Sequence, residues 1–446
     1  MKKFLAVLIA GTILSASSCA GQEEKAVTTE PAASEQTTPT ASEQAESAPE
    51  DLRETARALS EQMANGEFSD CAGRFSEEMK ASLDEAALKV AWTQVVTSAG
   101  DYVGVYDVSE TEQNGSVTVV TTLEYTKTGV TVTLVFDGEG TVEGLWLNYR
   151  TLAADSESEA FTEVKIRIGE YALDGILTLP ANAENPPVAI LIQGSGQSDF
   201  DETAGGIKPL RDLAHGLAER GIATIRFSKR FYQHPELADP ANVTIQTEVL
   251  EDVSAAIEFA QSRSDVNGEK LFLIGHSLGG MLAPVIAEEN EAVRGTVSLA
   301  GSPRRLEDIL CSQYEFQLRQ KGLSEEEIEE KAVSVQREAE RIKTLSDGEA
   351  GEYFGISGVY WKSLNEVKTA DAALALEIPM LFLQGDADVQ VYPDLDFAAW
   401  RELLAGKENC RFRLYEGLGH FFTDETGKVD QAVIEEIAEF VRSAEK

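Results

Sequence analysis

Basic residues are scarce in this chain of 446 residues: 38 Lys and Arg stand against 77 Asp and Glu, and the formal net charge is −39. A surface this acidic repels polyanions, which argues against nucleic acid and anionic membrane surfaces as partners. Long apolar runs are also lacking. Residues 4–14 form an apolar stretch, but it is too short to span a bilayer.

Cysteine and histidine are rare, with four residues of each. Beyond Cys19, the cysteines are Cys71, Cys311 and Cys410, which are odd in number and fit no metal-ligand spacing. We therefore expect no metal site, and the spacing leaves a single disulfide open without indicating one. No organic cofactor is implied either. With so few histidines, elimination among them is informative.

The first 18 residues are typical of an export signal: two lysines open the chain, residues 4–14 are apolar and residues 16–18 are small. Small residues directly before Cys19 resemble a bacterial lipobox, which implies that Cys19 becomes the lipidated first residue of the mature protein. An ordinary secretory signal cut near Ala20 is the alternative. We expect an extracytoplasmic protein that touches the cell membrane only through this lipid anchor.

Composition divides the next 130 or so residues into a tether and a small domain. Residues 19–50 are mostly Ala, Ser, Thr, Glu, Gln and Pro, a composition that cannot bury enough apolar surface to fold and predicts a disordered tether. Residues 51–150 show two helical periodicities and then four alternating runs with Gly-containing turns, which predicts a small α+β domain. The pattern resembles cystatin/NTF2-like domains of unknown function that precede secreted hydrolases. That resemblance implies spacing, dimerisation or surface capture.

Residues 161–446 begin with an antiparallel strand pair and continue with short apolar runs that alternate with amphipathic helices. This order predicts an α/β domain with a doubly wound, mostly parallel sheet covered on both faces. A long, charged, helical stretch at residues 304–375 interrupts the alternation. We expect this insertion to form a cap over the strand ends.

A glycine-rich turn at residues 275–280, Gly-His-Ser-Leu-Gly-Gly, joins an apolar run to a helical stretch. Strand, sharp turn and helix are the context of a nucleophile elbow, in which Ser277 takes strained backbone angles and glycines avoid clashes. The following helix directs its amide dipoles at developing negative charge. A strand–helix turn with an incidental serine is the alternative.

With the elbow, the strand order and the cap, the larger part of the chain resembles an α/β-hydrolase, in which nucleophile, acid and histidine follow in that order. The turn at residues 385–388 is similar to the family's G-x-x-D turn and implies Asp388 as the acid. The turn at residues 417–420 is similar to its G-x-x-H turn and implies His420 as the base. Asp386 is expected to accept hydrogen bonds from its own loop.

The other three histidines have weaker claims to the role of general base. His215 lies within an amphipathic helix, where we expect it to pack. His234 lies in a loop before a proline, and we expect it at the surface. His276 occupies the variable position of the elbow and is expected to point away from the Ser277 hydroxyl.

Two backbone amides are expected to stabilise an oxyanion: Leu278 N–H at the helix start, and Ser195 N–H in the loop after the strand at residues 188–193. Gln193 stands where many relatives have His. Because the expected oxyanion donor is a backbone amide, this difference in side chain matters little. Residues 193–199, 208–213 and 226–230 also resemble bacterial secreted acyl hydrolases. That resemblance extends to an aromatic pair near the site and implies substrate contacts from Gly194, Tyr360 and Trp361.

These observations predict a serine hydrolase, and in particular a carboxylesterase that cleaves small or medium acyl esters through an acyl-enzyme on Ser277. A serine peptidase and an acyltransferase of the same fold remain alternatives. A different class, a catalytically inert surface binding protein, is also open. The substrate is expected to be a small-molecule acyl ester, and the oligomeric state is left open.

Overall fold

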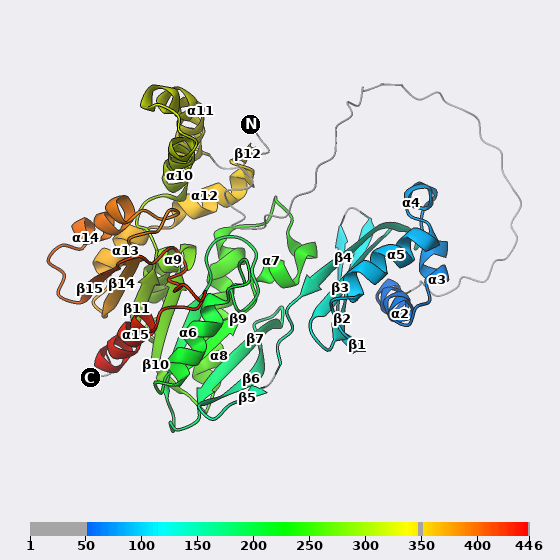
Figure 1. Cartoon of the computed structure of the whole chain (residues 1–446), viewed down its shortest axis with the longest axis horizontal. Coiled ribbons are helices and arrows are strands. Elements are labelled where there is room, and N and C mark those ends of the chain that lie inside the picture. The colour runs from blue at the N-terminus through cyan, green and yellow to red at the C-terminus, as the bar shows by residue number, and fades with distance from the viewer. Residues whose placement is uncertain (1–50, 114, 155, 347–350, 445–446) are drawn as a thin grey trace, which may run out of the picture.

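The computed structural model describes residues 51–113, 115–154, 156–346 and 351–444, which form a small domain and a larger one (Figure 1). The predicted signal peptide, Cys19 and the predicted tether lie outside the described residues. Within the described part of the chain, no helix combines the length and apolarity needed to cross a bilayer.

The small domain is α+β, as predicted. Its four antiparallel strands pair in sequence order, and α2 and α5 bury their apolar residues against one face of the sheet. The short helices α3 and α4 were not predicted, because they are too short to show a period. The elements are α2 (Leu52–Ala64), α3 (Ser69–Gly73), α4 (Glu77–Ser82), α5 (Glu85–Val96), β1 (Tyr102–Gln113), β2 (Ser116–Tyr125), β3 (Gly129–Phe136) and β4 (Val142–Arg150).

The larger domain is built on a nine-stranded sheet of order β15-β14-β11-β10-β8-β9-β7-β6-β5. The strands from β9 through β8, β10, β11 and β14 to β15 are parallel, whereas β7, β6 and β5 are antiparallel to their neighbours. The predicted mostly parallel sheet is thus confirmed. The strands are β5 (Ser156–Glu157), β6 (Phe161–Ile168), β7 (Leu173–Pro180), β8 (Pro187–Ile192), β9 (Ala223–Phe227), β10 (Asn267–His276), β11 (Val293–Leu299), β14 (Met380–Gly385) and β15 (Cys410–Tyr415).

Helices cover both faces of this sheet, and each face has its own apolar core. Helices α6 (Pro209–Ala218) and α15 (Gln431–Ala444) pack on one face. Helices α8 (Glu251–Ser262), α9 (Leu278–Glu289) and α14 (Ala398–Leu403) pack on the other, together with part of the cap. The connections also contain the short helices α7 (Arg230–Gln233) and η1 (Pro235–Leu237) and two π turns, η2 (Gln246–Leu250) and η3 (Pro393–Phe397).

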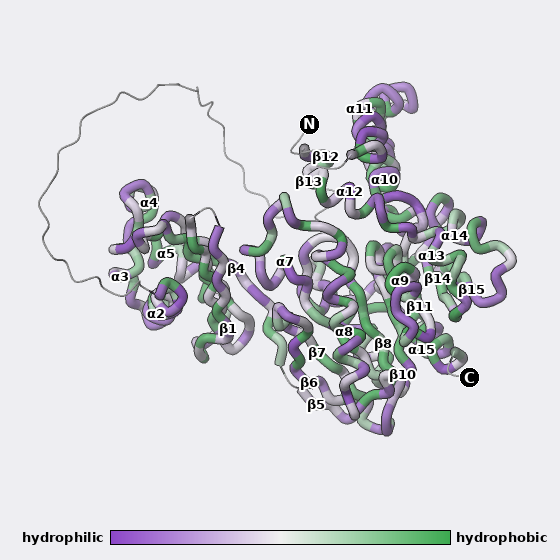
Figure 2. Tube along the Cα trace, turned by 180° about the vertical axis from the view of Figure 1, so that it is seen from behind, coloured by the Kyte–Doolittle hydropathy of each residue, from purple (hydrophilic) through white to green (hydrophobic). Residues whose placement is uncertain are grey.

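The insertion between β11 and β14 is mainly helical, as expected, and also contains a small hairpin. Figure 1 shows α10 and α11 projecting from the domain, while α12 and α13 lie closer to the sheet. Figure 2 shows that α11 is largely hydrophilic along its projecting part. The elements are α10 (Leu306–Gln320), α11 (Glu325–Lys343), β12 (Glu352–Tyr353), β13 (Ile356–Ser357), α12 (Gly358–Glu366) and α13 (Thr369–Ala375).

A buried carboxylate, Asp174 of β7, joins the two domains. Arg150 at the end of β4 donates to Asp174 Oδ2 at 2.7 Å, and the hydroxyl of Tyr106 from β1 donates to Oδ1 at 3.1 Å. Arg167 of β6 pairs with the same carboxylate. Asp174 is fully buried and the Arg150 side chain is 5 % exposed, so water does not compete for this contact. Charge pairing therefore fixes the small domain against the antiparallel edge of the large sheet.

We expect Arg150→Met to lower the free energy of unfolding by about 3 kcal/mol, because it removes one partner from a buried carboxylate. Thermal melts measure the loss, and limited proteolysis should show faster cleavage of the linker after Arg150. The control is Arg57→Met, whose ion pair with Glu54 is half-exposed and should contribute less than about 1 kcal/mol. Equal changes in the two variants would contradict a joint based on Asp174.

Candidate active site

Ser277 stands on the sharp turn between β10 and α9 with φ 52° and ψ −113°, angles that a non-glycine residue takes only under strain. Its neighbours must be glycine: a Cβ at Gly275 would lie 2.1 Å from Gly279 O, and a Cβ at Gly279 would lie 2.5 Å from Ile192 O. Ser277 N–H donates to Leu299 O at 2.8 Å. The turn therefore holds a partly exposed serine at the carboxyl end of the central strands.

Asp388 and His420, far apart in sequence, meet beside this edge of the sheet, with Nδ1 of His420 2.8 Å from Oδ2 of Asp388. The other carboxylate oxygen accepts hydrogen bonds from the amides of Gln390 and Val391 at 2.8 and 3.0 Å. Burial raises the pKa of Asp388, but His420 and these amides outweigh it and hold the pKa below its ordinary value. An ionised Asp388 keeps the proton on Nδ1 and leaves Nε2 free to accept one.

Asp386 has a different place from Asp388. It is exposed, and its Oδ1 accepts a hydrogen bond from Gly417 N at 2.7 Å. We expected donors from its own loop, which is wrong, because the amide comes from the neighbouring loop that carries His420. The contact ties the two loops together, and a Cβ at Gly385 would lie 2.1 Å from Leu418 O, so they also pack closely.

His276 is buried and contacts the backbone of the loop that carries His420. Its Nε2 lies 3.1 Å from the carbonyl oxygen of His420, and its Nδ1 lies 2.9 Å from Oε1 of Glu202. Burial lowers the pKa of His276, but the Glu202 carboxylate outweighs it and the net shift is upward. Sequence reasoning missed Glu202. The acidic run Asp-Phe-Asp-Glu at residues 199–202, next to the expected oxyanion loop, was the available signal.

The two remaining histidines take no part in this arrangement. His215 of α6 stacks on Phe161 with ring centroids 4.3 Å apart, and its Nε2 lies 2.9 Å from Glu163 Oε1. His234 was expected at the surface, which is wrong: it is buried. Its Nδ1 lies 3.1 Å from Glu236 Oε1, and its Nε2 lies 3.0 Å from the carbonyl oxygen of Tyr171.

The loop after β8 passes directly over Ser277. A Cβ at Gly194 would lie 3.1 Å from Ser277 Cβ, so a larger residue there would crowd the serine. Gly194 N–H donates to Glu202 Oε1 at 2.6 Å. The next amide, Ser195 N–H, donates to no protein acceptor within the described part of the chain. Leu278 is the first residue of α9, where amides have no partner inside the helix.

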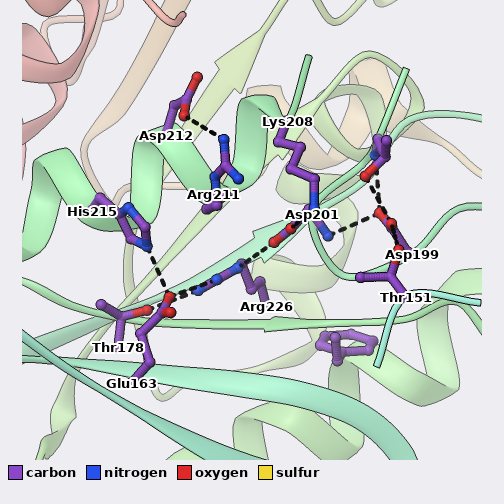
Figure 3. Close-up of polar contacts among 12 residues, drawn as sticks. Thr151, Glu163, Thr178, Asp199, Asp201, Lys208, Arg211, Asp212, His215 and Arg226 are labelled. Atoms are coloured by element: carbon purple, nitrogen blue, oxygen red, sulfur yellow. Dashed lines mark hydrogen bonds and ion pairs between the residues drawn. The ribbon is translucent and has the colours of Figure 1, made fainter. Parts of the chain in front are cut away.

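Buried charges hold the far end of this loop (Figure 3). Asp201 accepts from Arg226 of β9 and from Lys208, both at 2.9 Å. Arg226 also reaches Glu163 of β6 at 2.6 Å, so the loop is tied across the sheet. Asp199, two residues before, accepts from the hydroxyl of Thr151 at 2.7 Å. The linker between the domains thus contacts the loop that carries Gly194 and Ser195.

Tyr360 and Trp361 of α12 were expected to line a substrate pocket, and the structure places them differently. Trp361 is fully buried, and its Nε1 donates to the backbone of Tyr353 at 2.8 Å within the cap. Its ring meets Phe354 edge-on, at 6.1 Å. Tyr360 is also buried, and its hydroxyl is hydrogen-bonded to Glu248. Trp361 therefore packs the cap's own core, and Tyr360 connects the cap to the domain below.

A cavity of about 160 Å³ does lie between the cap and the elbow helix. Met281 of α9, one turn beyond Ser277, lines it together with Leu364 of α12 and Thr369 of α13. The buried carboxylate of Glu307 lines it as well, and burial raises the pKa of this group. The cap thus contributes most of the lining of this cavity, which reaches the elbow helix at Met281.

Within the part of the chain that the structure describes, this site contains neither a metal-binding cluster nor a disulfide. Among the described residues, no three His, Cys, Asp or Glu side chains are grouped so as to hold a metal ion. Cys71, Cys311 and Cys410 are free thiols.

Comparison with known proteins assigns relatives to both domains. Residues 56–145 match the family described as "Protein of unknown function (DUF3887)", and residues 207–427 match the family described as "Serine aminopeptidase, S33". Esterase EstD of Thermotoga maritima is 30% identical over 391 residues, which cover 84% of this chain and 91% of that protein.

Solved structures with a similar fold share less sequence. Est1E from Butyrivibrio proteoclasticus is 18% identical with a TM-score of 0.43, covering 63% of this chain and 98% of that one. A puromycin-hydrolysing peptidase of Mycobacterium tuberculosis is 15% identical with a TM-score of 0.44, covering 77% and 48%. The identity and coverage shared with Esterase EstD show that this chain belongs to the esterase family of α/β-hydrolases that includes that enzyme.

Proposed function

We propose that the protein is a serine carboxylesterase that cleaves small or medium acyl esters through an acyl-enzyme on Ser277. The observation that carries the proposal is the buried Asp388–His420 contact at 2.8 Å, formed beside a strained serine elbow. Membership in the EstD family supports the same chemistry. A buried, aligned carboxylate–imidazole pair is what activation of a serine hydroxyl requires.

In the proposed reaction, His420 Nε2 takes the proton of Ser277 as its oxygen attacks the ester carbonyl carbon. Asp388 keeps the imidazole in the required tautomer and stabilises the imidazolium that forms. The carbonyl oxygen becomes an oxyanion, which the amides of Leu278 and Ser195 bind. The alcohol leaves with the proton from His420. Water then attacks the acyl-enzyme carbonyl while His420 takes a proton from the water, and His420 returns this proton to Ser277 as the acid is released.

We further propose that acyl-chain preference depends on the cavity between α9 and the cap. Its lining by Met281 and Leu364 supports an apolar occupant, while Arg304 and Glu307 make part of its rim polar. Gly194 is assigned to the substrate-facing wall because it passes over Ser277.

The protein is also proposed to act outside the cytoplasm, anchored to the bacterial membrane through a lipid on Cys19. The support comes from the basic start, the apolar stretch at residues 4–14 and the small residues before Cys19.

A panel of nitrophenyl esters of graded chain length, assayed beside aminoacyl nitroanilides, tests the reaction class. We expect turnover of the shorter esters, little turnover of the anilides, and labelling by a fluorophosphonate probe that Ser277→Ala abolishes. Labelling without ester turnover, or faster turnover of anilides, would contradict an esterase. Absence of labelling would favour an inert binding protein.

Two aspartates in one loop allow a matched test of the proposed acid. Asp388→Asn should lower kcat by about 10³- to 10⁴-fold, because an amide at this position favours the wrong histidine tautomer. Asp386→Asn removes the same charge from an exposed position, and kcat should stay within about threefold of wild type, with the larger effect on thermal stability. Steady-state kinetics on one ester measures both. Reversed effects would identify Asp386 as the acid.

For the proposed anchor, Cys19→Ala expressed in a bacterial host should move the protein from the detergent phase to the aqueous phase in a phase-separation assay, since the lipid is lost. Metabolic labelling with a fatty-acid analogue should disappear in parallel. Cys71→Ala is the control and should keep both signals. An unlabelled wild type would point to ordinary secretion.

A further inference from the structure

Lys229 lies two residues after the end of β9 and directly before α7, and it is buried. Lysine is rarely buried without a partner. Its side chain is 4 % exposed, and Nζ donates to the carbonyl oxygen of Gly194 and pairs with Glu248 Oε1 at 2.8 Å. The backbone N–H of Lys229 donates to Ser198 O at 3.1 Å. One residue thus grips the loop over Ser277 at two points.

The carbonyl that Lys229 binds belongs to the same peptide group as the amide of Ser195. This peptide is trans, as are all peptide bonds of the described residues. In a planar trans peptide, C=O and N–H point in opposite directions, so holding Gly194 O fixes the direction of Ser195 N–H. A cation on the oxygen also draws electron density from the amide and makes its N–H a stronger donor.

Both polar atoms of Gly194 are occupied by buried charged groups. Its N–H donates to Glu202, and its C=O accepts from Lys229. Ser195 N–H has no protein acceptor within the described residues, and it follows directly on Gly194, where a Cβ would crowd Ser277. Glu202 and Lys229 therefore hold the two peptide groups on either side of the Gly194 Cα atom, and the amide of the second peptide, Ser195 N–H, stays available for the reaction.

We propose that Lys229 is the positioning residue of the oxyanion site: its ammonium group orients and polarises the Gly194–Ser195 peptide so that Ser195 N–H binds the oxyanion. This assignment rests on the proposed function, in which Ser195 is one of the two donors. Lys229 itself does not touch substrate. It acts through the peptide that it holds.

The cap takes part in holding Lys229. Glu248, its ionic partner, lies on the π turn Gln246–Leu250, and such turns are frequent at functional sites. The hydroxyl of Tyr360 in α12 is hydrogen-bonded to Glu248, and Ser363 of the same helix accepts from Ile245 N at 2.9 Å. A continuous polar chain therefore runs from the cap through Glu248 and Lys229 to the peptide over Ser277.

The test compares Lys229→Met with Arg230→Met, the neighbouring buried cation, which pairs with Asp252 at 2.6 Å and is not bonded to the loop. For Lys229→Met we expect kcat to fall by about 10- to 100-fold, with KM within about threefold, because the lost donor geometry matters most in the transition state. Arg230→Met should lose thermal stability with kcat within about threefold of wild type. Glu248→Gln keeps the shape of the buried side chain and should lower kcat severalfold. This second variant tests the proposal if Lys229→Met fails to fold.

Affinity for a trifluoromethyl ketone separates positioning from general destabilisation. Ser277 Oγ adds to the ketone carbon, the hydroxyl proton passes to His420, and the ketone oxygen becomes an oxyanion in the same place. Its inhibition constant should rise with the fall in kcat for Lys229→Met, whereas that of the non-fluorinated methyl ketone should not change. Equal kcat and equal ketone affinity in the Lys229 and Arg230 variants would overturn the assignment. A wild type that hydrolyses no ester would instead overturn the proposed function.

Discussion

The strained backbone of Ser277 is the constraint around which the larger domain is arranged. A non-glycine residue in that conformation costs about 1 to 3 kcal/mol, and the surrounding structure must hold it. Close packing does so: Gly275 and Gly279 approach each other and Ile192 at distances that allow no Cβ. The hydrogen bond from Ser277 N–H to the carbonyl oxygen of Leu299 also ties the elbow to the neighbouring strand, β11. The strain is therefore distributed over β8, β10 and β11, the centre of the sheet.

Buried ion pairs hold the loops in position, as close packing holds the elbow. Asp201 with Arg226, Glu202 with His276 and Lys229 with Glu248 each hold a segment at the carboxyl edge of the sheet. Pairs of this kind add little net stability, because removing two charges from water cancels most of their attraction. They fix the orientation of the segments that carry them, because any other arrangement would leave one charge buried without a partner. In a chain with a formal net charge of −39, Arg226 and Lys229 are thus two basic residues that lie buried beside these loops.

The same logic explains how the small domain is attached. Its apolar residues form a core of their own, and its buried polar contact with the larger domain is made by Arg150 and Tyr106 on Asp174. Thr151, the next residue after β4, contacts Asp199 in the loop over Ser277. The attachment therefore lies close to the proposed oxyanion site, although every proposed catalytic group comes from the larger domain.

Much of this could be read from the sequence, and the reason is physical. A buried strand, a tight turn and an amphipathic helix are local patterns, so the succession of strands and helices along the chain and the elbow were predictable. The resemblance to the α/β-hydrolases indicated the turns that carry Asp388 and His420. The burial of His234, the contact from Asp386 to Gly417 and the roles of Glu202 and Lys229 were not. Each depends on two segments far apart in the chain that meet only when the sheet closes. Trp361 illustrates the same limit, because an aromatic residue in a cap helix has the same local pattern whether it faces a pocket or the cap's core. The sequence alone determined where the backbone must turn and which chemistry it could present, while the tertiary structure decided which charges meet and which side chains are enclosed, because those depend on distances between segments that no local pattern encodes.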